Sequence, residues 1–347
     1  MTQLFTYNET FTLESGDSLP RLQLAYSTYG ELNDRRNNVI WIFHALTANS
    51  NPVEWWPGLV GDGRFFDPAK YFIICVNKPG SPYGSSSPVS TNPATGEPYY
   101  DSFPVFTIRD IIRGFRLLKN HLGISEILAG LGGSTGGMQL LEWAIMEPSL
   151  FRHIVPIVTN AALSPWGIAF NASQRMAIEA DSSWLEHRPD AGQKGLAAAR
   201  SIALLSYRHY NGYDITQSRD KSFVALTPDT VFAADNYQRY QGMKLVNRFN
   251  VISYYRLTQA MDSHDVGRGR EGGVKGALAQ ITARTLVIGI KSDVLYPISE
   301  QEFLRDHING AGLLSIASDF GHDGFLLEYE KIEQALAGFI DSRASNN

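Results

Sequence analysis

A serine between closely spaced glycines offers the clearest chemistry in this chain of 347 residues. Ser134 stands in Gly132-Gly133-Ser134-Thr135-Gly136, a G-x-S-x-G pattern. The apolar run Ile127 to Leu131 before it predicts a strand, and the pattern from Gly137 to Met146 after it predicts a helix. A serine on such a turn exposes its hydroxyl for nucleophilic attack, and the helix N-terminus favours an anionic intermediate. No G-K-[ST] follows, so the pattern favours an acyl-transfer nucleophile over a phosphate loop or an incidental loop serine.

An aspartate and a histidine follow two late apolar runs. Asp293 comes just after the run Thr285 to Ile290, and His322 lies in a loop after the run Leu313 to Ala317. Each residue alone is most simply a turn or surface residue. Together they stand in the chain order Ser, Asp, His and in the expected contexts, which predicts a triad. His322 then takes the serine proton, and Asp293 orients the imidazole.

The oxyanion of an acyl-transfer reaction needs two backbone N–H donors. Such donors carry no side-chain signature, so position in the sequence assigns them. Thr135 follows the nucleophile directly and supplies the first donor. The second comes from the loop His44-Ala45-Leu46-Thr47 after the apolar run Val39 to Phe43, where we choose Leu46. This choice gives His44 to the oxyanion loop and leaves His322 as the base.

The elements that position these residues follow an alternating pattern. Uninterrupted apolar runs separated by helical patterns predict parallel strands covered on both faces, and the alternating segment before Gly30 predicts antiparallel edge strands. The alternation gives way to helical patterns alone between Ser164 and about Gly276. We therefore predict an α/β-hydrolase fold: a mostly parallel sheet with helices on both faces and a helical lid insertion. The core domain is discontinuous, 1–163 and 277–347, and the lid is 164–276.

Composition excludes several classes of protein. The net charge of −5 gives no basic field for nucleic acid or an anionic membrane. The one cysteine, Cys75, lies in the apolar run Phe72 to Val76, which favours a buried core residue over a reactive thiol. No secretory signal opens the sequence and no apolar stretch reaches membrane-spanning length, so a cytoplasmic, soluble protein without a metal site is expected.

Further motifs spread over nearly the whole chain resemble those of the homoserine O-acetyltransferases of methionine biosynthesis. The motifs that fall within 164–276 are far more specific than G-x-S-x-G. The matching segments are His44-Ala45-Leu46-Thr47, Gly80-Ser81, Gly84-Ser85, Ser90 to Gly96, Phe103-Pro104, Thr107 to Asp110, Gly132 to Gln139, Glu142-Trp143, Gln174-Arg175, Ala177-Ile178, Ser206-Tyr207-Arg208, Asn247-Arg248-Phe249, Tyr254, Ala260-Met261-Asp262 and Gly321 to Leu326.

The resemblance implies a ping-pong reaction. Acetyl-CoA, the acyl-donor substrate, acetylates Ser134, and the acetyl group then passes to the hydroxyl of L-homoserine. By motif match, Arg208 pairs with the carboxylate of homoserine and Asp323 contacts its amino group, which suits a guanidinium and a carboxylate. The resemblance also implies a homodimer formed through the lid and no permanently bound cofactor.

Some positions depart from the family pattern. Thr135 stands where methionine is usual, Lys78-Pro79 and Pro82 stand where apolar residues and cysteine are typical, and His209 stands where serine or threonine is common. Three related reactions therefore stay open: transfer from succinyl-CoA, transfer to serine, and hydrolysis of an ester, since all run through an acyl-serine. A non-catalytic binding protein on a decayed hydrolase fold predicts a missing triad residue, and none is missing.

Overall fold

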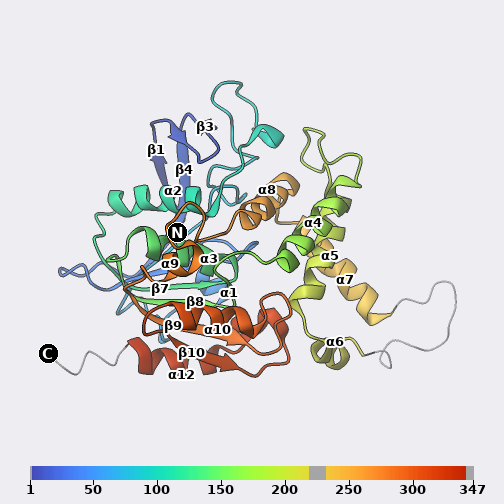
Figure 1. Ribbon diagram of the computed structural model, residues 1–347. Helices are drawn as coiled ribbons and strands as arrows, with labels where there is room; N and C mark the ends of the chain where they lie inside the picture. The colour runs from blue at the N-terminus through green and yellow to red at the C-terminus, as the bar shows by residue number, and fades with distance from the viewer. Residues whose placement is uncertain (1, 219–231, 341–347) are drawn as a thin grey trace.

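The computed structural model describes residues 2–218 and 232–340, and an eight-stranded sheet runs through it (Figure 1). The strand order is β1-β4-β6-β5-β7-β8-β9-β10. The pairs β1–β4 and β4–β6 are antiparallel, and every pair from β6 to β10 is parallel. The strands of this sheet are β1 (Thr2–Tyr7), β4 (Leu22–Tyr29), β5 (Val39–Phe43), β6 (Phe72–Val76), β7 (Ile127–Gly133), β8 (Phe151–Ile157), β9 (Arg284–Ile290) and β10 (Gly312–Ile316). A separate pair joins β2 (Phe11–Thr12) to β3 (Ser18–Leu19).

The central strands fill two hydrophobic cores, one on each face of the sheet. In β5, Trp41 and Phe43 pack into the first core, whereas Ile40 and Ile42 pack into the second. Successive side chains of a strand point to opposite faces, which explains why the apolar run has no polar interruption. The first core is covered by α2 (Ile108–His121), α3 (Thr135–Met146), α9 (Gly273–Leu278) and α10 (Ile298–His307), and the second by α1 (Pro52–Trp55) and α12 (Tyr329–Ile340).

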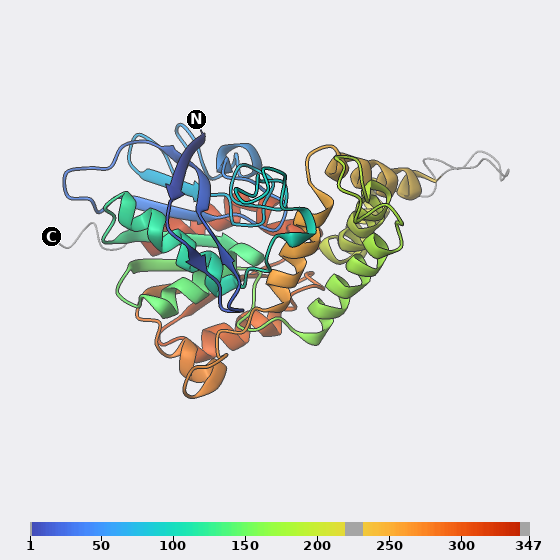
Figure 2. The ribbon, with the colours of Figure 1, turned by 90° about the horizontal axis from the view of Figure 1, so that it is seen from above.

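Between Leu163 and Val266 the described residues form helices that lie to one side of the sheet, as Figure 2 shows. The two ends of this segment are joined at its base, because the Leu163 N–H donates to His264 and the Val266 N–H donates to Ala161. The segment is therefore anchored to the sheet beside the end of β8. Its helices are α4 (Pro165–Glu179), α5 (Gln193–Tyr207), α6 (Tyr210–Thr216), α7 (Ala233–Val246) and α8 (Val251–Asp262).

The structure confirms the predicted class of fold. Each apolar run named above lies within a strand or overlaps one, and α3 begins at Thr135, two residues before the predicted pattern. Helices α6 and α7 fall within the segment for which helical patterns alone are predicted. The division into a core and a lid at 164–276 stays a prediction. Cys75 is fully buried, as its apolar run predicts. No helix among the residues described is long and apolar enough to cross a membrane.

Candidate active site

Ser134 lies on the sharp turn between β7 and α3. Its backbone has φ 57° and ψ −125°, a conformation that is costly for a residue with a side chain. The neighbouring glycines make the turn possible, because a Cβ atom on Gly132 would overlap Gly136 and one on Gly136 would overlap the carbonyl oxygen of Phe43. The Ser134 N–H donates to the Ile157 carbonyl at 3.0 Å and ties the turn to β8. The G-x-S-x-G spacing is thus a steric requirement of this turn.

Asp293 and His322 form a buried pair. The Nδ1 atom of His322 lies 2.7 Å from Oδ2 of Asp293, and both residues are at most 4% exposed. The other carboxylate oxygen accepts the backbone N–H groups of Leu295 (2.8 Å) and Tyr296 (2.9 Å), which fix the Asp293 side chain. A carboxylate accepts hydrogen bonds, so the pairing places the imidazole proton on Nδ1 and leaves Nε2 able to take a proton.

Ser134 and His322 line one cavity of about 540 Å³. The same cavity is lined by Leu46 and by the cationic side chains of Arg200 and Arg248. The remaining lining residues are Ala45, Thr47, Ala48, Asn49, Glu54, Trp55, Tyr83, Tyr207, Lys244, Asp323, Phe325 and Leu326. The volume lies in the range of small-molecule sites. The structure therefore brings the predicted nucleophile and base to the same cavity.

Of the two predicted oxyanion donors, Leu46 lines this space and Thr135 directly follows Ser134 in the chain. Thr135 begins α3, and its N–H, like that of Leu46, has no hydrogen-bond acceptor within residues 2–218 and 232–340. Both residues are buried, at 2% and 6% exposure. A buried, unpaired N–H is costly unless a ligand or water accepts from it, and the N-terminus of a helix favours negative charge. Both N–H groups thus have the properties that an oxyanion site requires.

Arg208 and Asp323 contact each other as an ion pair. Arg208 ends α5, and its guanidinium also donates to the Tyr237 hydroxyl from Nη2 (3.1 Å) and Nε (3.3 Å). The loop that carries His322 packs against this end of α5, since a Cβ atom on Gly321 (φ 63°) would lie 2.8 Å from the carbonyl carbon of Arg208. Asp323 lines the catalytic cavity, whereas Arg208 reaches it through Asp323. The partly buried Arg208 is not the solvated helix residue that its position alone would suggest.

Three residues near the site, Tyr207, Tyr296 and Lys78, were given no role on the basis of sequence. The rings of Tyr207 and Tyr296 lie 5.6 and 5.3 Å from the His322 ring, centroid to centroid, and restrict its movement. Burial raises the pKa of Tyr296 well above its ordinary value, so its hydroxyl stays neutral. Lys78 is fully buried and donates to the carbonyls of the oxyanion loop. Its departure from the apolar family pattern was the one available signal.

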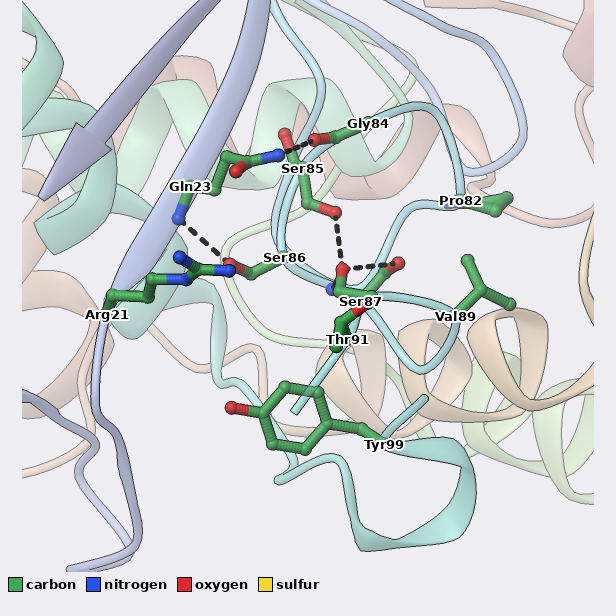
Figure 3. Close-up of a pocket in the computed structure, with 11 residues that line it drawn as sticks. Arg21, Gln23, Pro82, Gly84, Ser85, Ser86, Ser87, Val89, Thr91 and Tyr99 are labelled. Atoms are coloured by element: carbon green, nitrogen blue, oxygen red, sulfur yellow. Dashed lines mark hydrogen bonds between the residues drawn. The ribbon is translucent and has the colours of Figure 1, made fainter. Parts of the chain in front are cut away.

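A second cavity, of about 330 Å³, is drawn in Figure 3 and has no triad residue in its lining. Two of its serine hydroxyls are already hydrogen-bonded to the backbone. Oγ of Ser86 accepts from the Gln23 N–H and Oγ of Ser85 accepts from the Ala25 N–H, each at 2.9 Å. None of the predicted site residues lines it. Among the residues described, no group of three or more His, Cys, Asp or Glu side chains is placed to hold a metal ion. The candidate active site is therefore the cavity at Ser134.

Comparison with known proteins agrees with this geometry. Residues 38–329 match the family model of the α/β hydrolase fold. The homoserine O-acetyltransferase of Cyclobacterium marinum is 46% identical over 345 residues, which are 98% of this chain and 95% of the relative. The crystal structure of homoserine O-acetyltransferase from Bacillus anthracis superposes with a TM-score of 0.89 at 26% identity, covering 98% of this chain and 97% of the other. An acetylester hydrolase from Corynebacterium glutamicum shares the fold, with a TM-score of 0.86 at 23% identity and coverage of 98% and 96%.

The fold, together with a serine on its strand-to-helix turn, defines an enzyme of the α/β-hydrolase superfamily. Within that superfamily the chain belongs to the homoserine O-acetyltransferase family, because identity to its members extends over nearly the full length of both chains. The family resemblance found in the sequence motifs is confirmed.

Proposed function

We propose that this chain carries out the reaction for which its family is named, by a ping-pong mechanism through an acetylated Ser134. The observation that carries the proposal is the shared cavity. Ser134, on its strand-to-helix turn, and His322, paired with the buried Asp293, line the same space. A serine, a histidine and an aspartate in these relations are the parts that nucleophilic acyl transfer needs.

In the first half-reaction, Oγ of Ser134 attacks the thioester carbonyl of acetyl-CoA. His322 takes the serine proton at Nε2, and the Asp293 carboxylate stabilises the resulting imidazolium. The negative charge that develops on the carbonyl oxygen is met by the N–H groups of Leu46 and Thr135. The C–S bond then breaks, the CoA sulfur leaves with the proton from His322, and the acetyl group remains on Ser134.

In the second half-reaction, the same steps run with an amino-acid hydroxyl as nucleophile. His322 removes the proton of the homoserine hydroxyl, whose oxygen attacks the acetyl-serine carbonyl. Ser134 leaves and regains its proton from His322. Arg208 binds the homoserine carboxylate, and Asp323 binds its ammonium group. These two side chains are paired with each other in the structure, so binding of the homoserine zwitterion replaces that one ion pair with two.

Cations around the cavity support an anionic acyl donor. Arg200, Lys244 and Arg248 come from the helical segment and line the cavity that holds Ser134. Arg248 is held in place, since its Nη1 donates to the Thr47 carbonyl (2.5 Å) and the Tyr83 hydroxyl (2.6 Å). Acetyl-CoA carries several phosphate charges, which such cations attract. No permanently bound cofactor takes part in the proposed reaction.

The proposal includes a homodimer formed through the helices of 164–276 and a cytoplasmic location. Large apolar side chains on these helices are exposed, among them Met176 (66%), Leu205 (59%) and Tyr240 (60%). Packing of a second chain against these helices would remove such side chains from water. Sedimentation of the purified protein tests this part, and a monomer at micromolar concentration would contradict it.

Release of free CoA thiol tests the reaction itself. Purified protein is given acetyl-CoA or succinyl-CoA, each with L-homoserine, L-serine or no acceptor. We expect rapid release only with acetyl-CoA and homoserine, together with an acetyl group on Ser134 in the peptide mass spectrum when the acceptor is left out. Equal release with and without acceptor would indicate hydrolysis, and faster release with succinyl-CoA or serine would reassign the substrates.

A further inference from the structure

A lysine with no acidic partner lies beneath the proposed oxyanion loop. Lys78 is 2% exposed, and no ion pair of Lys78 occurs among the residues that the structure describes. Its Nζ donates to the carbonyl oxygens of His44 and Ala45, each at 3.0 Å. Burying an ammonium group without a carboxylate is costly, and apolar side chains of similar length fill such a place without that cost. A buried cation kept under these conditions calls for a functional explanation.

The carbonyl of Ala45 belongs to the same peptide unit as the N–H of Leu46. All described peptide bonds are trans, so this carbonyl and this N–H point in opposite directions. A cation bonded to the oxygen therefore fixes the direction of the N–H. It also withdraws electron density from the amide, which makes the N–H a stronger donor. The Leu46 N–H has no acceptor of its own within the described residues and lies at the wall of the catalytic cavity.

His44 completes the arrangement around this peptide. Its Nδ1 lies 2.8 Å from the Ala45 oxygen, and its Nε2 accepts the Lys78 backbone N–H at 3.3 Å. The accepting Nε2 is unprotonated, so Nδ1 carries the proton and donates to Ala45. Burial and the charge of Lys78 lower the pKa of His44 well below its ordinary value, and His44 stays neutral. The Ala45 carbonyl is thus held by donors from both residues.

We propose that Lys78 is a positioning residue of the oxyanion hole, which directs and polarises the Leu46 N–H through the Ala45 carbonyl. The inference rests on the proposed assignment of Leu46 as an oxyanion donor. The charge of Lys78 stabilises the oxyanion from the carbonyl side of the Ala45–Leu46 peptide, in a place that water does not reach. Lys78 touches no substrate in this proposal and acts only through the backbone of the loop.

The charge of Lys78 gives the proposal a pH signature. Burial lowers the pKa of Lys78 to about 7. The titratable groups that interact with it are His44 and Cys75, and burial raises the pKa of the Cys75 thiol, so neither gains charge near neutrality. As pH rises through 7, Lys78 loses its charge and with it the stronger polarisation of the peptide.

The test compares Lys78→Met with Lys119→Met. Lys119 is also buried, but it binds Glu147 (3.1 Å) and neither residue lines the cavity at Ser134, so its loss removes an ion pair and packing away from the proposed oxyanion loop. Loss of a whole oxyanion donor costs about 10²–10³-fold in kcat, and Lys78→Met keeps the donor in weakened form, so we expect a loss of about 10–100-fold. KM values should change less than about twofold, since ground-state binding is untouched. Lys119→Met should lower Tm and leave kcat unchanged.

The pH profile separates positioning from packing. The ratio of wild-type to Lys78→Met kcat cancels every pH dependence that the two proteins share. We expect this ratio to be largest below pH 7 and to shrink above it. An unchanged kcat in Lys78→Met, or a loss that is the same at every pH, would overturn the proposal. Neither result would affect the role of Ser134, which Ser134→Ala tests separately.

A measurement on the wild type covers the case in which Lys78→Met does not fold. Trifluoroacetone, a ketone, forms a tetrahedral adduct when Oγ of Ser134 attacks its carbonyl carbon. The serine proton moves to His322 and the charge stays on the former carbonyl oxygen, so this step alone takes no proton from solvent. The new anion raises the pKa of Lys78, so we expect uptake of a fraction of one proton at pH 8, measured with an indicator dye. Adduct formation without uptake would overturn the proposal.

Discussion

The two sides of the catalytic cavity are held by different kinds of contact. On the sheet side, backbone groups fix the chemistry: Ser134 by its turn geometry, and Asp293 by two N–H donors. On the helical side, side chains hold Arg208, namely Asp323 and the Tyr237 hydroxyl. Groups fixed by the backbone keep their places whether or not substrate is bound, whereas paired side chains exchange partners. In our proposal, the reaction centre is preorganised and the acceptor site is rearranged by its ligand.

The largest effect should come from the sheet side, with Ser134→Ala. Without the hydroxyl no acetyl-serine forms, so we expect kcat for CoA release to fall by about 10⁴-fold or more. The buried Asp293–His322 pair does not depend on the serine, so Tm should stay within a few degrees of the wild type. Turnover near the wild-type level, with the fold intact, would show that another residue is the nucleophile.

The turn itself should be the next most sensitive feature. Gly136→Ala places a methyl group where the carbonyl oxygen of Phe43 lies, and backbone cannot move aside as a side chain can. We expect a loss of about 1–3 kcal/mol in the free energy of unfolding, measured by urea denaturation, and a lower kcat because Ser134 shifts.

Gly338→Ala is the matched control for this turn. Gly338 lies inside α12 with open space around its Cβ position, so alanine should raise stability by about 0.5–1 kcal/mol through helix propensity. If both variants changed stability equally, the close approach at the turn would not be what requires glycine at 136.

On the helical side, Arg208→Met should separate the two half-reactions. Removing the guanidinium leaves the homoserine carboxylate without its partner, and a charged hydrogen-bonded pair contributes about 2–3 kcal/mol, so we expect kcat/KM for homoserine to fall by about 100-fold. Acetylation of Ser134 in the absence of acceptor should keep its rate. A slower acetylation with unchanged use of homoserine would place Arg208 at the donor. Arg239→Met, in an exposed ion pair on α7, serves as the control.

The sheet side could be predicted from sequence because its requirements are local. The glycines around Ser134 are set by the steric limits of its turn. The apolar runs before Asp293 and His322 follow from the packing of their strands within the sheet. The fold class and the family are confirmed, while the roles of the site residues and the division at 164–276 remain predictions. Periodicity placed strands within a few residues, since buried parallel strands show uninterrupted apolar runs.

The helical side could not be predicted in the same way. Arg208 and Asp323 are 115 positions apart by number, and no local pattern shows that they pair. Only motif resemblance named them. The role of Lys78 could not be predicted for a related reason. A lysine in a loop is ordinarily solvent-exposed, and the burial of Lys78 depends on how the His44 loop folds over it. Polar residues that work through tertiary contacts leave little signal in sequence.

The smallest effect should come from Tyr237, whose hydroxyl accepts hydrogen bonds from Arg208. Tyr237→Phe removes the hydroxyl that accepts from Arg208 and leaves the ring in place. One such hydrogen bond contributes about 1 kcal/mol, so KM for homoserine should rise about fivefold while kcat for acetylation of Ser134 stays constant. Tyr240→Phe on the same helix, with its side chain largely in solvent, should change neither value. If Tyr237→Phe left KM unchanged while Arg208→Met raised it, Asp323 and the ligand alone would position the guanidinium, and the acceptor site would need no support from α7.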